Sequence, residues 1–282
     1  MSAGRRIQSL YFSPTGTTRK ILSTIEEHSG LPLVSQIDLT LPKQRESFTG
    51  RVQGDVILVG SPVYSGSPPW PMMEPLNRLE GHGKWAVPVA VYGNRSPDTC
   101  VDELAKILRA RGFKILAAAS FIAQHSLASK DHPWALGRPD QSDLDTAVKF
   151  GEQVKEKLSS SPSEIQTSDR LLNSITGKMV ESLPEGYHKN LAEGIKGLIT
   201  VTFSKDKMCT ECTSCTNACP TGAIKIDSKE ITNDLCIRCT ACMRACPEGV
   251  LSPQLNDSPN ARAAIEGLDK IFAVRKEPKI YI

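Results

Sequence analysis

Two cysteine-rich runs in the second half of the chain constrain its fold more than any other feature. The first reads CTECTSCTNACP from Cys209, and the second reads CIRCTACMRACP from Cys236. Each is C-x-x-C-x-x-C-x-x-x-C-P, and each cysteine of the second run lies 27 residues after its counterpart in the first. This constant offset indicates a duplicated unit. Three thiolates spaced three residues apart on a tight loop can surround one face of a metal centre.

Zinc sites, disulfide frameworks and iron–sulfur centres all use several cysteines, and the sequence distinguishes among the three. A zinc ribbon would leave the two matching four-cysteine runs unexplained. A disulfide framework needs an oxidising compartment, and no export signal follows the basic N-terminal residues MSAGRR. Soft thiolates suit iron–sulfur centres, and the prolines after Cys219 and Cys246 fix the chain where each run ends. An iron–sulfur site is therefore the favoured interpretation.

The repeated motif resembles that of bacterial two-cluster ferredoxins, in which the fourth cysteine of each run binds the other cluster. The resemblance implies two 4Fe–4S clusters with crossed ligation. It assigns one cluster to Cys209, Cys212, Cys215 and Cys246. It assigns the other cluster to Cys236, Cys239, Cys242 and Cys219. The ninth cysteine, Cys100, is expected to be a small buried apolar residue.

Bulk properties exclude several classes of protein. The chain has 282 residues, a length typical of two domains. Its 34 basic and 31 acidic residues leave a net charge of +3, which indicates no strong attraction to nucleic acid or membrane surfaces. No apolar run approaches the length of a membrane span. Eight of the nine cysteines must stay reduced to bind clusters. We therefore expect a cytoplasmic protein of an anaerobic or facultative cell.

The residues before the cysteine runs alternate between strand and helix patterns. Strands are expected at 7–13, 33–39, 55–60, 85–92 and 113–123. Helices are expected at 16–28, 68–79, 98–110 and 142–158. This alternation predicts a doubly wound α/β domain with a five-stranded parallel sheet. A Ser-rich stretch at 159–168 indicates a boundary, and 169–194 has a helical pattern.

A phosphate-binding loop is predicted where the first strand runs into the first helix, at Ser13-Pro-Thr-Gly-Thr-Thr18. Hydroxyl groups at a glycine turn before a helix N-terminus can hold a phosphate. Ser13, Thr15, Thr17 and Thr18 supply hydroxyls, and Gly16 lets the backbone approach closely. No lysine lies in the loop, which excludes a nucleotide-triphosphatase P-loop. A plain threonine-rich helix cap is the alternative.

Two further loops follow strands, at 61–69 and 93–98. Ligands of such sheets lie at the carboxyl ends of the strands. The motifs YFSPTGTT, SPVYSG and YGNR therefore fall at one edge, and they resemble the FMN-binding loops of flavodoxins. Together with the cysteine runs, the chain resembles the bacterial flavodoxin–ferredoxin fusions called ferrodoxins. The resemblance implies a flavodoxin-like domain at 5–158, a partly helical linker at 159–196, a small α+β ferredoxin-like domain at 197–252 and a C-terminal extension at 253–282.

The resemblance also assigns roles around a bound FMN. Tyr64 is expected to pack on the flavin ring, with the backbone of Ser61, Pro62 and Val63 beside it. The backbone of Gly93 and Asn94 is expected at the pyrimidine end of the ring. Arg95 would place a positive charge near the flavin N1 atom, a departure from the acidic surroundings usual in flavodoxins.

The implied function is electron transfer between two 4Fe–4S clusters and FMN, to or from a redox partner such as a ferredoxin, a reductase or an acceptor enzyme. The alternative is a self-contained reductase of a small-molecule substrate, with the clusters as an internal wire. His125 follows the last strand and is a candidate proton donor for that reaction, although a structural histidine is the more frequent case. Neither nucleic acid nor a membrane is an expected partner.

Overall fold

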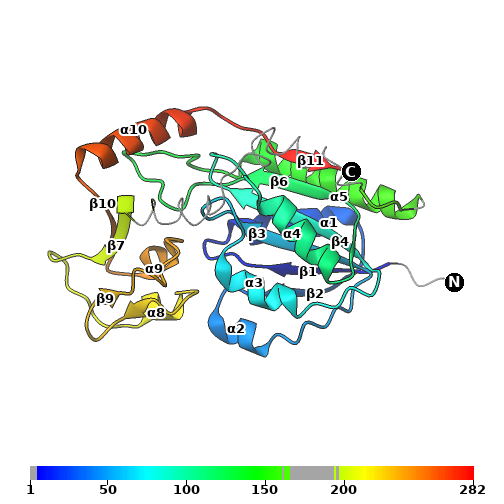
Figure 1. Cartoon of the computed structure of the whole chain (residues 1–282), viewed down its shortest axis with the longest axis horizontal. Coiled ribbons are helices and arrows are strands. Elements are labelled where there is room, and N and C mark those ends of the chain that lie inside the picture. Colours follow the sequence, from blue (N-terminus) through cyan, green and yellow to red (C-terminus); the bar gives the residue numbers. More distant parts are fainter. Residues whose placement is uncertain (1–4, 161, 166–193, 195–196) are drawn as a thin grey trace.

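The computed structural model describes residues 5–160, 162–165, 194 and 197–282. A parallel sheet flanked by helices occupies one side of the molecule, and a smaller unit of short strands and helices lies beside it (Figure 1). The elements of the first unit are β1 (Ile7–Tyr11), α1 (Thr17–Ser29), β2 (Leu33–Asp38), α2 (Pro42–Ser47), β3 (Val56–Pro62), α3 (Trp70–Asn77), β4 (Trp85–Tyr92), α4 (Cys100–Ala110), β5 (Lys114–Ile115), β6 (Ala118–Ile122) and α5 (Gln141–Ser159).

The order of the strands identifies the fold of the first unit. The sheet runs β11-β6-β4-β3-β1-β2, and β1, β2, β3, β4 and β6 are all parallel. These five strands have the 2-1-3-4-5 order of flavodoxin-like sheets. Central strands β1, β3 and β6 are buried along their whole length, as expected for a sheet covered by helices on both faces. The predicted doubly wound α/β domain is confirmed.

Helices cover the two faces of the sheet with separate apolar cores. On one face, Ile21 and Leu22 of α1 and Phe150 of α5 pack together against the sheet. On the other face, Met72 of α3 and Leu104 of α4 do the same. Gly151 lets α5 approach α1 closely, because an added Cβ there would lie 2.6 Å from the backbone oxygen of Ile25.

The sheet departs from the predicted five parallel strands in two places. The expected strand at 113–123 is interrupted, so that β5 and β6 each pair separately with β4. A further strand, β11 (Lys279–Tyr281), comes from the C-terminus and pairs antiparallel with β6. The C-terminal extension therefore completes the sheet of the first unit, which its short sequence KIYI did not indicate.

The second unit contains β7 (Ile199–Phe203), α8 (Ser214–Asn217), β8 (Ile224–Lys225), β9 (Glu230–Ile231), α9 (Ala241–Ala245) and β10 (Leu251–Leu255). The antiparallel pair β7–β10 flanks the two cysteine runs in sequence and the pair β8–β9 lies between them, which gives the predicted small α+β arrangement. α10 (Pro259–Ala273) follows and leads back to β11 across the top of Figure 1.

The predicted connection between the units lies mostly outside the described residues. The helical segment expected at 169–194 is described only at Gly194, so it remains a prediction, as do the domain boundaries. Strand β10 continues to Leu255, three residues past the expected end of the ferredoxin-like domain. In the part of the chain that the structure describes, no helix is long and apolar enough to cross a membrane.

Candidate functional site

The predicted phosphate loop joins β1 to α1 and leaves the N-terminus of the helix open. Gly16 has a left-handed backbone with φ 82°, and a Cβ added there would meet no atom within 4 Å. Ser13 Oγ accepts a hydrogen bond of 3.1 Å from the Arg19 N–H. The N-cap residue of α1 is Gly16, which has no side chain to cap the helix. Such an open helix N-terminus suits an anion.

Thr18 carries an unpaired hydroxyl into this loop. Its side chain is 1% exposed, yet Oγ1 has no hydrogen-bond partner among the residues that the structure describes. The methyl group of Thr18 faces Gly60, where an added Cβ would lie 2.9 Å from it. Leaving a buried hydroxyl unpaired costs about 1–3 kcal/mol. The loop therefore fits a terminal phosphate, which would supply the missing acceptor.

The two predicted ring loops follow β3 and β4 and are joined to each other. The Tyr64 and Ser67 backbones exchange hydrogen bonds of 3.0 and 3.2 Å across a tight turn. Gly66 in that turn accepts a bond of 3.1 Å from the Thr99 N–H at the end of the second loop. Tyr64 is half-buried, and burial raises its pKa well above the ordinary value of 10.0. The loops after β1, β3 and β4 thus lie on adjacent strands at one edge of the sheet.

In the second ring loop, the side chain of Asn94 points to the C-terminal tail. Asn94 is buried and has a left-handed backbone with φ 67°. Its Nδ2 atom donates bonds of 2.9 Å to the backbone oxygens of Phe272 and Val274. Arg95 forms an ion pair with the buried carboxylate of Asp98. Arg95 in the second ring loop is therefore neutralised by Asp98 and is not an isolated positive charge.

The eight motif cysteines form two separate thiol groups. One hollow is lined by Cys209, Cys212, Cys215 and Cys246, which we call the outer thiol group. A second hollow is lined by Cys219, Cys236, Cys239 and Cys242, the inner thiol group. These are the two sets that crossed ligation requires. Ligation itself remains a prediction.

The chemistry of the thiols fits a cationic iron–sulfur core. Burial, with a smaller contribution from neighbouring cysteines, raises the pKa values of Cys239 and Cys242 to about 12. Such thiols become thiolates only beside compensating positive charge, which bound iron supplies. Among the described residues, no three His, Cys, Asp or Glu side chains converge on a position for a single metal ion.

The inner thiol group lies against the flavodoxin-like unit. Thr240 Oγ1 donates a bond of 2.9 Å to the Ser126 backbone oxygen, and Ser126 Oγ donates one of 3.2 Å to the Arg238 oxygen. Arg45 of α2 donates a bond of 2.7 Å to the Pro220 oxygen, beside Cys219. Ile237 of the second cysteine run packs against the same apolar core as Val63 and Tyr64 of the first ring loop. The inner thiol group therefore faces the ring loops.

The outer thiol group is more open to solvent. Cys212 is exposed, whereas Cys219 and Cys239 of the inner group are buried. Met208, next to Cys209, is 85% exposed. The two groups thus differ in position, one facing the flavodoxin-like unit and one facing outward.

His125 lies beside the ring loops but in a packed setting. Its ring makes edge contacts with Trp134 and Phe272, at centroid distances of 5.1 and 5.0 Å. Its Nδ1 atom accepts a bond of 3.2 Å from the Leu127 N–H. Burial, with help from the charge of Arg95, lowers its pKa to about 4. The neutral ring packs beneath Gly93, where an added Cβ would lie 2.4 Å from it.

Sequence reasoning missed the residues that join the units. Ser126, Arg45 and Thr240 carry no local signal for this role, because each acts only across a tertiary contact. Thr40, which follows β2, accepts a bond of 2.9 Å from the Ser13 N–H and so supports the phosphate loop. Cys100 is fully buried, and burial raises its pKa well above the ordinary value, as expected for an apolar role.

Known proteins are similar to both parts of the chain. Residues 208–251 match the family model described as a 4Fe-4S dicluster domain. Solved structures similar to the chain include a flavodoxin from the domain Archaea, with 15% identity over 55% of this chain and 99% of that one at a TM-score of 0.41. Flavodoxin 2 from Bacillus cereus has 18% identity over 54% of this chain and 99% of that one, also at 0.41.

A flavodoxin of Streptococcus pneumonia TIGR4 has 18% identity over 54% of this chain and 98% of that one, at a TM-score of 0.40. Comparison with curated protein sequences finds no match. The strand order and the matched cysteine motif, rather than these low identities, decide the assignment. The chain joins a flavodoxin-like α/β domain to a 4Fe–4S dicluster domain, as the resemblance to flavodoxin–ferredoxin fusions predicted.

Proposed function

We propose that the protein transfers electrons between two 4Fe–4S clusters and FMN, and to or from a redox partner. The observation that carries this proposal is the contact of the inner thiol group with the flavodoxin-like unit, through Thr240 and Ser126. When bound, the clusters supply one-electron chemistry and FMN supplies both one- and two-electron chemistry. The polypeptide holds these groups, sets their order and controls the access of solvent.

Each cluster is held by one thiol group. Cys209, Cys212, Cys215 and Cys246 hold the outer cluster, and the inner thiol group holds the other, with the fourth cysteine of each run crossing over. Two separate hollows, each lined by four cysteines, support this number of clusters. Because thiolate ligands must stay reduced, we place the protein in the cytoplasm.

FMN is held at the carboxyl edge of the sheet. The open N-terminus of α1 and the unpaired Thr18 hydroxyl hold its phosphate. Tyr64 and the backbone of Ser61, Pro62 and Val63 border the ring, and the backbone of Gly93 and Asn94 meets its pyrimidine end. The Asn94 side chain already bonds the tail, so only its backbone remains for the flavin.

The positions of the thiol groups give the order of transfer. The inner group lies next to the first ring loop, where Ile237 packs against the same core as Tyr64, and the outer group reaches solvent through Cys212. We therefore place the redox partner at the outer cluster and the flavin at the inner one. The direction of electron transfer depends on the reduction potential of the partner. Either a ferredoxin-like donor or an acceptor enzyme satisfies this arrangement.

The reductase alternative has less support. Its candidate proton donor, His125, is neutral because burial lowers its pKa to about 4. Nδ1 is occupied by the Leu127 N–H, and two aromatic side chains enclose the ring. A residue held in this way suits support of the Gly93 turn better than proton transfer to a substrate.

An anaerobic preparation tests the proposal. Acid-released flavin should be FMN at one per chain, and iron and sulfide should match two 4Fe–4S clusters. In stopped flow with a one-electron reductant, the rate of transfer between clusters and flavin should not change with protein concentration, because a tethered pair reacts within one molecule. A rate that rises in proportion to concentration, or a preparation that contains FAD or no flavin, would overturn it.

A further inference from the structure

The C-terminal residues 274–282, which we call the strap, return from α10 to the flavodoxin-like sheet. They pass the second ring loop and end in β11, which pairs with Ala118, Ala119 and Ser120 of β6 (Figure 1). The chain thus leaves the flavodoxin-like unit after α5 and comes back to it after the cysteine runs. This return places the strap at the carboxyl edge of the sheet, where the FMN site is proposed.

Asn94 binds the end of α10 and the strap with the polar atoms of its side chain. Nδ2 donates to the Phe272 and Val274 oxygens at 2.9 Å each, and Oδ1 accepts from the Lys276 N–H at 3.1 Å. The left-handed backbone of Asn94, with φ 67°, turns its side chain toward the tail. Asparagine tolerates this backbone better than most residues do. The turn that would meet the flavin is therefore held by hydrogen bonds to the end of α10 and to the strap.

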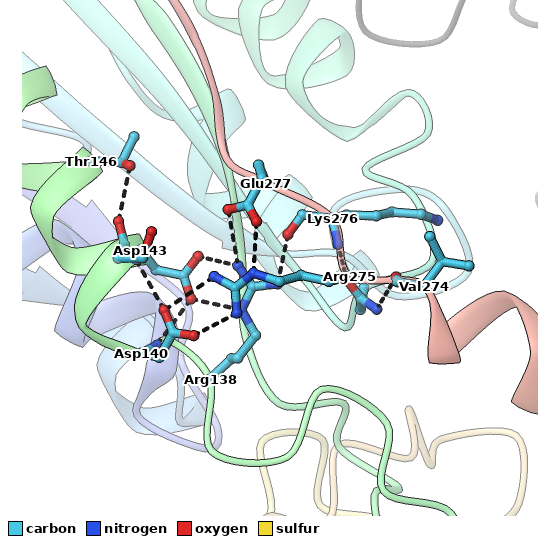
Figure 2. A network of polar contacts seen from close by, with 10 residues as sticks. Arg138, Asp140, Asp143, Thr146, Val274, Arg275, Lys276 and Glu277 are labelled. Carbon is cyan, nitrogen blue, oxygen red and sulfur yellow. Dashed lines mark hydrogen bonds and ion pairs between the residues drawn. The ribbon is translucent and has the colours of Figure 1, made fainter.

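A second set of contacts holds the strap from the other side (Figure 2). Arg138 Nη1 donates a bond of 2.6 Å to the Lys276 oxygen, and the same guanidinium pairs with the fully buried carboxylate of Asp143. Arg275 Nη1 donates a bond of 2.7 Å to Asp140, at the N-terminus of α5. Lys276 is thus held at its backbone N–H and its backbone oxygen.

Lys276 also brings charge to the ring loop. Its Nζ atom donates a hydrogen bond to the Arg95 backbone oxygen. Burial, together with the charge of Arg95, lowers the pKa of Lys276. Since Arg95 already pairs with Asp98, the strap supplies a second cation beside the loop.

We propose that the strap is a component of the flavin-ring site and that Asn94 is its positioning residue, an inference that rests on the proposed FMN site. The strap holds the Gly93–Asn94 turn in the shape that binds the ring. The same segment follows α10, whose Phe272 and Asp269 contact Trp134. Binding of the flavin ring and anchoring of the C-terminal part of the chain are therefore linked.

Asn94→Gly tests this role without imposing strain. Glycine keeps the left-handed backbone of residue 94 but removes the two side-chain bonds to the strap and the one to Phe272 of α10. Arg262→Gln is the control, since Arg262 lies on α10, pairs with Asp257 and is exposed. Both variants and the wild type are titrated with FMN and with riboflavin, at a temperature where circular dichroism shows each fully folded. Amide exchange of residues 93–98 is measured on the flavin-free proteins.

We expect a loss of affinity for the flavin ring, with no separate loss of affinity for the phosphate. Asn94→Gly should raise the dissociation constants for FMN and riboflavin equally, by at least about fivefold, the effect of roughly one net hydrogen bond. It should also speed amide exchange in 93–98, while Arg262→Gln matches the wild type. Truncation after Ala273 should show the same pattern if the shortened chain folds.

Failure of the inference and failure of the proposed function give different results. If wild type binds FMN and Asn94→Gly binds both flavins as tightly, with unchanged exchange in 93–98, the strap has no role in the ring site. An effect on FMN alone would place the strap at the phosphate instead, and would also overturn it. If wild type binds no flavin, the proposed FMN site itself is wrong.

Discussion

Thr240 donates a hydrogen bond of 2.9 Å to the backbone oxygen of Ser126. The first residue lies in the second cysteine run and the second lies just after the last parallel strand, so this bond joins the two cofactor-binding units. Thr213 holds the corresponding position in the first run, 27 residues earlier, and has the same left-handed backbone, with φ 61° against 63°. The repeat therefore contains one threonine that docks and one that does not contact the flavodoxin-like unit through any described hydrogen bond.

Changing Thr240→Val should slow electron transfer between clusters and flavin. Valine keeps the shape of threonine and removes the hydroxyl that bonds Ser126, so the inner thiol group should separate more often from the ring loops. We expect the internal rate in stopped flow to fall at least about threefold, for a net bond of about 1 kcal/mol. Iron, sulfide and FMN content should not change. The matched control, Thr213→Val, should retain the wild-type rate; equal slowing in both variants would contradict a docking role.

Changing Cys219→Ala should damage the cluster held by the second cysteine run. Cys219 shares a cavity with Cys236, Cys239 and Cys242, although it belongs to the first run. Electron paramagnetic resonance of the reduced protein can be compared with two references, Cys236→Ala and Cys209→Ala. The Cys219→Ala spectrum should match the first reference. A match to Cys209→Ala would mean that ligation is not crossed.

Changing Thr18→Val should weaken the binding of FMN but not the binding of riboflavin. The substitution keeps the methyl group that faces Gly60 and removes the buried hydroxyl that lacks a partner. A hydrogen bond to a charged group contributes about 1.5–3 kcal/mol, so the dissociation constant for FMN should rise at least roughly tenfold. Isothermal titration with both flavins measures it. Equal loss for riboflavin would show that Thr18 supports the fold rather than the phosphate.

Glu26 of α1 should make stability depend on pH. It is 6% exposed, and burial raises its pKa above the ordinary 4.5, only partly offset by a hydrogen bond of 2.5 Å from Gln36. The folded state therefore keeps the Glu26 proton when the unfolded chain has lost it. This stabilisation is fully present below pH 4.5 and is lost as pH rises through the folded-state pKa.

The variant Glu26→Gln removes that dependence, because its amide does not ionise. At pH 8 the variant should unfold at a higher urea concentration than the wild type, because only the wild type loses stability as the pH rises through the pKa of buried Glu26. The control is Glu27→Gln, the exposed next residue on α1. A wild type whose midpoint is constant between pH 5 and 8, relative to the variant, would show that Glu26 is not protonated in the fold.

Much of the fold could be predicted because its signals are local. Apolar runs such as 56–60 and 85–92 place central strands, and the glycine turn at Gly16 marks the start of α1. The strand at 113–123 was expected to be continuous because the run is apolar throughout. Its pairing with β4 breaks at Leu116, which only the partner strand determines. The short α2 has no apolar periodicity and was not predicted.

The sequence by itself determined the cysteine repeat, the alternation of strands and helices and the three loops at the carboxyl edge, because spacing and periodicity are written along the chain. Only the tertiary structure decided which thiol group faces the flavodoxin-like unit, that Asn94 binds the strap and that KIYI adds a strand beside β6. These relationships join residues more than 100 positions apart. Their hydrogen bonds depend on how the units pack, and no local pattern encodes a partner at that distance.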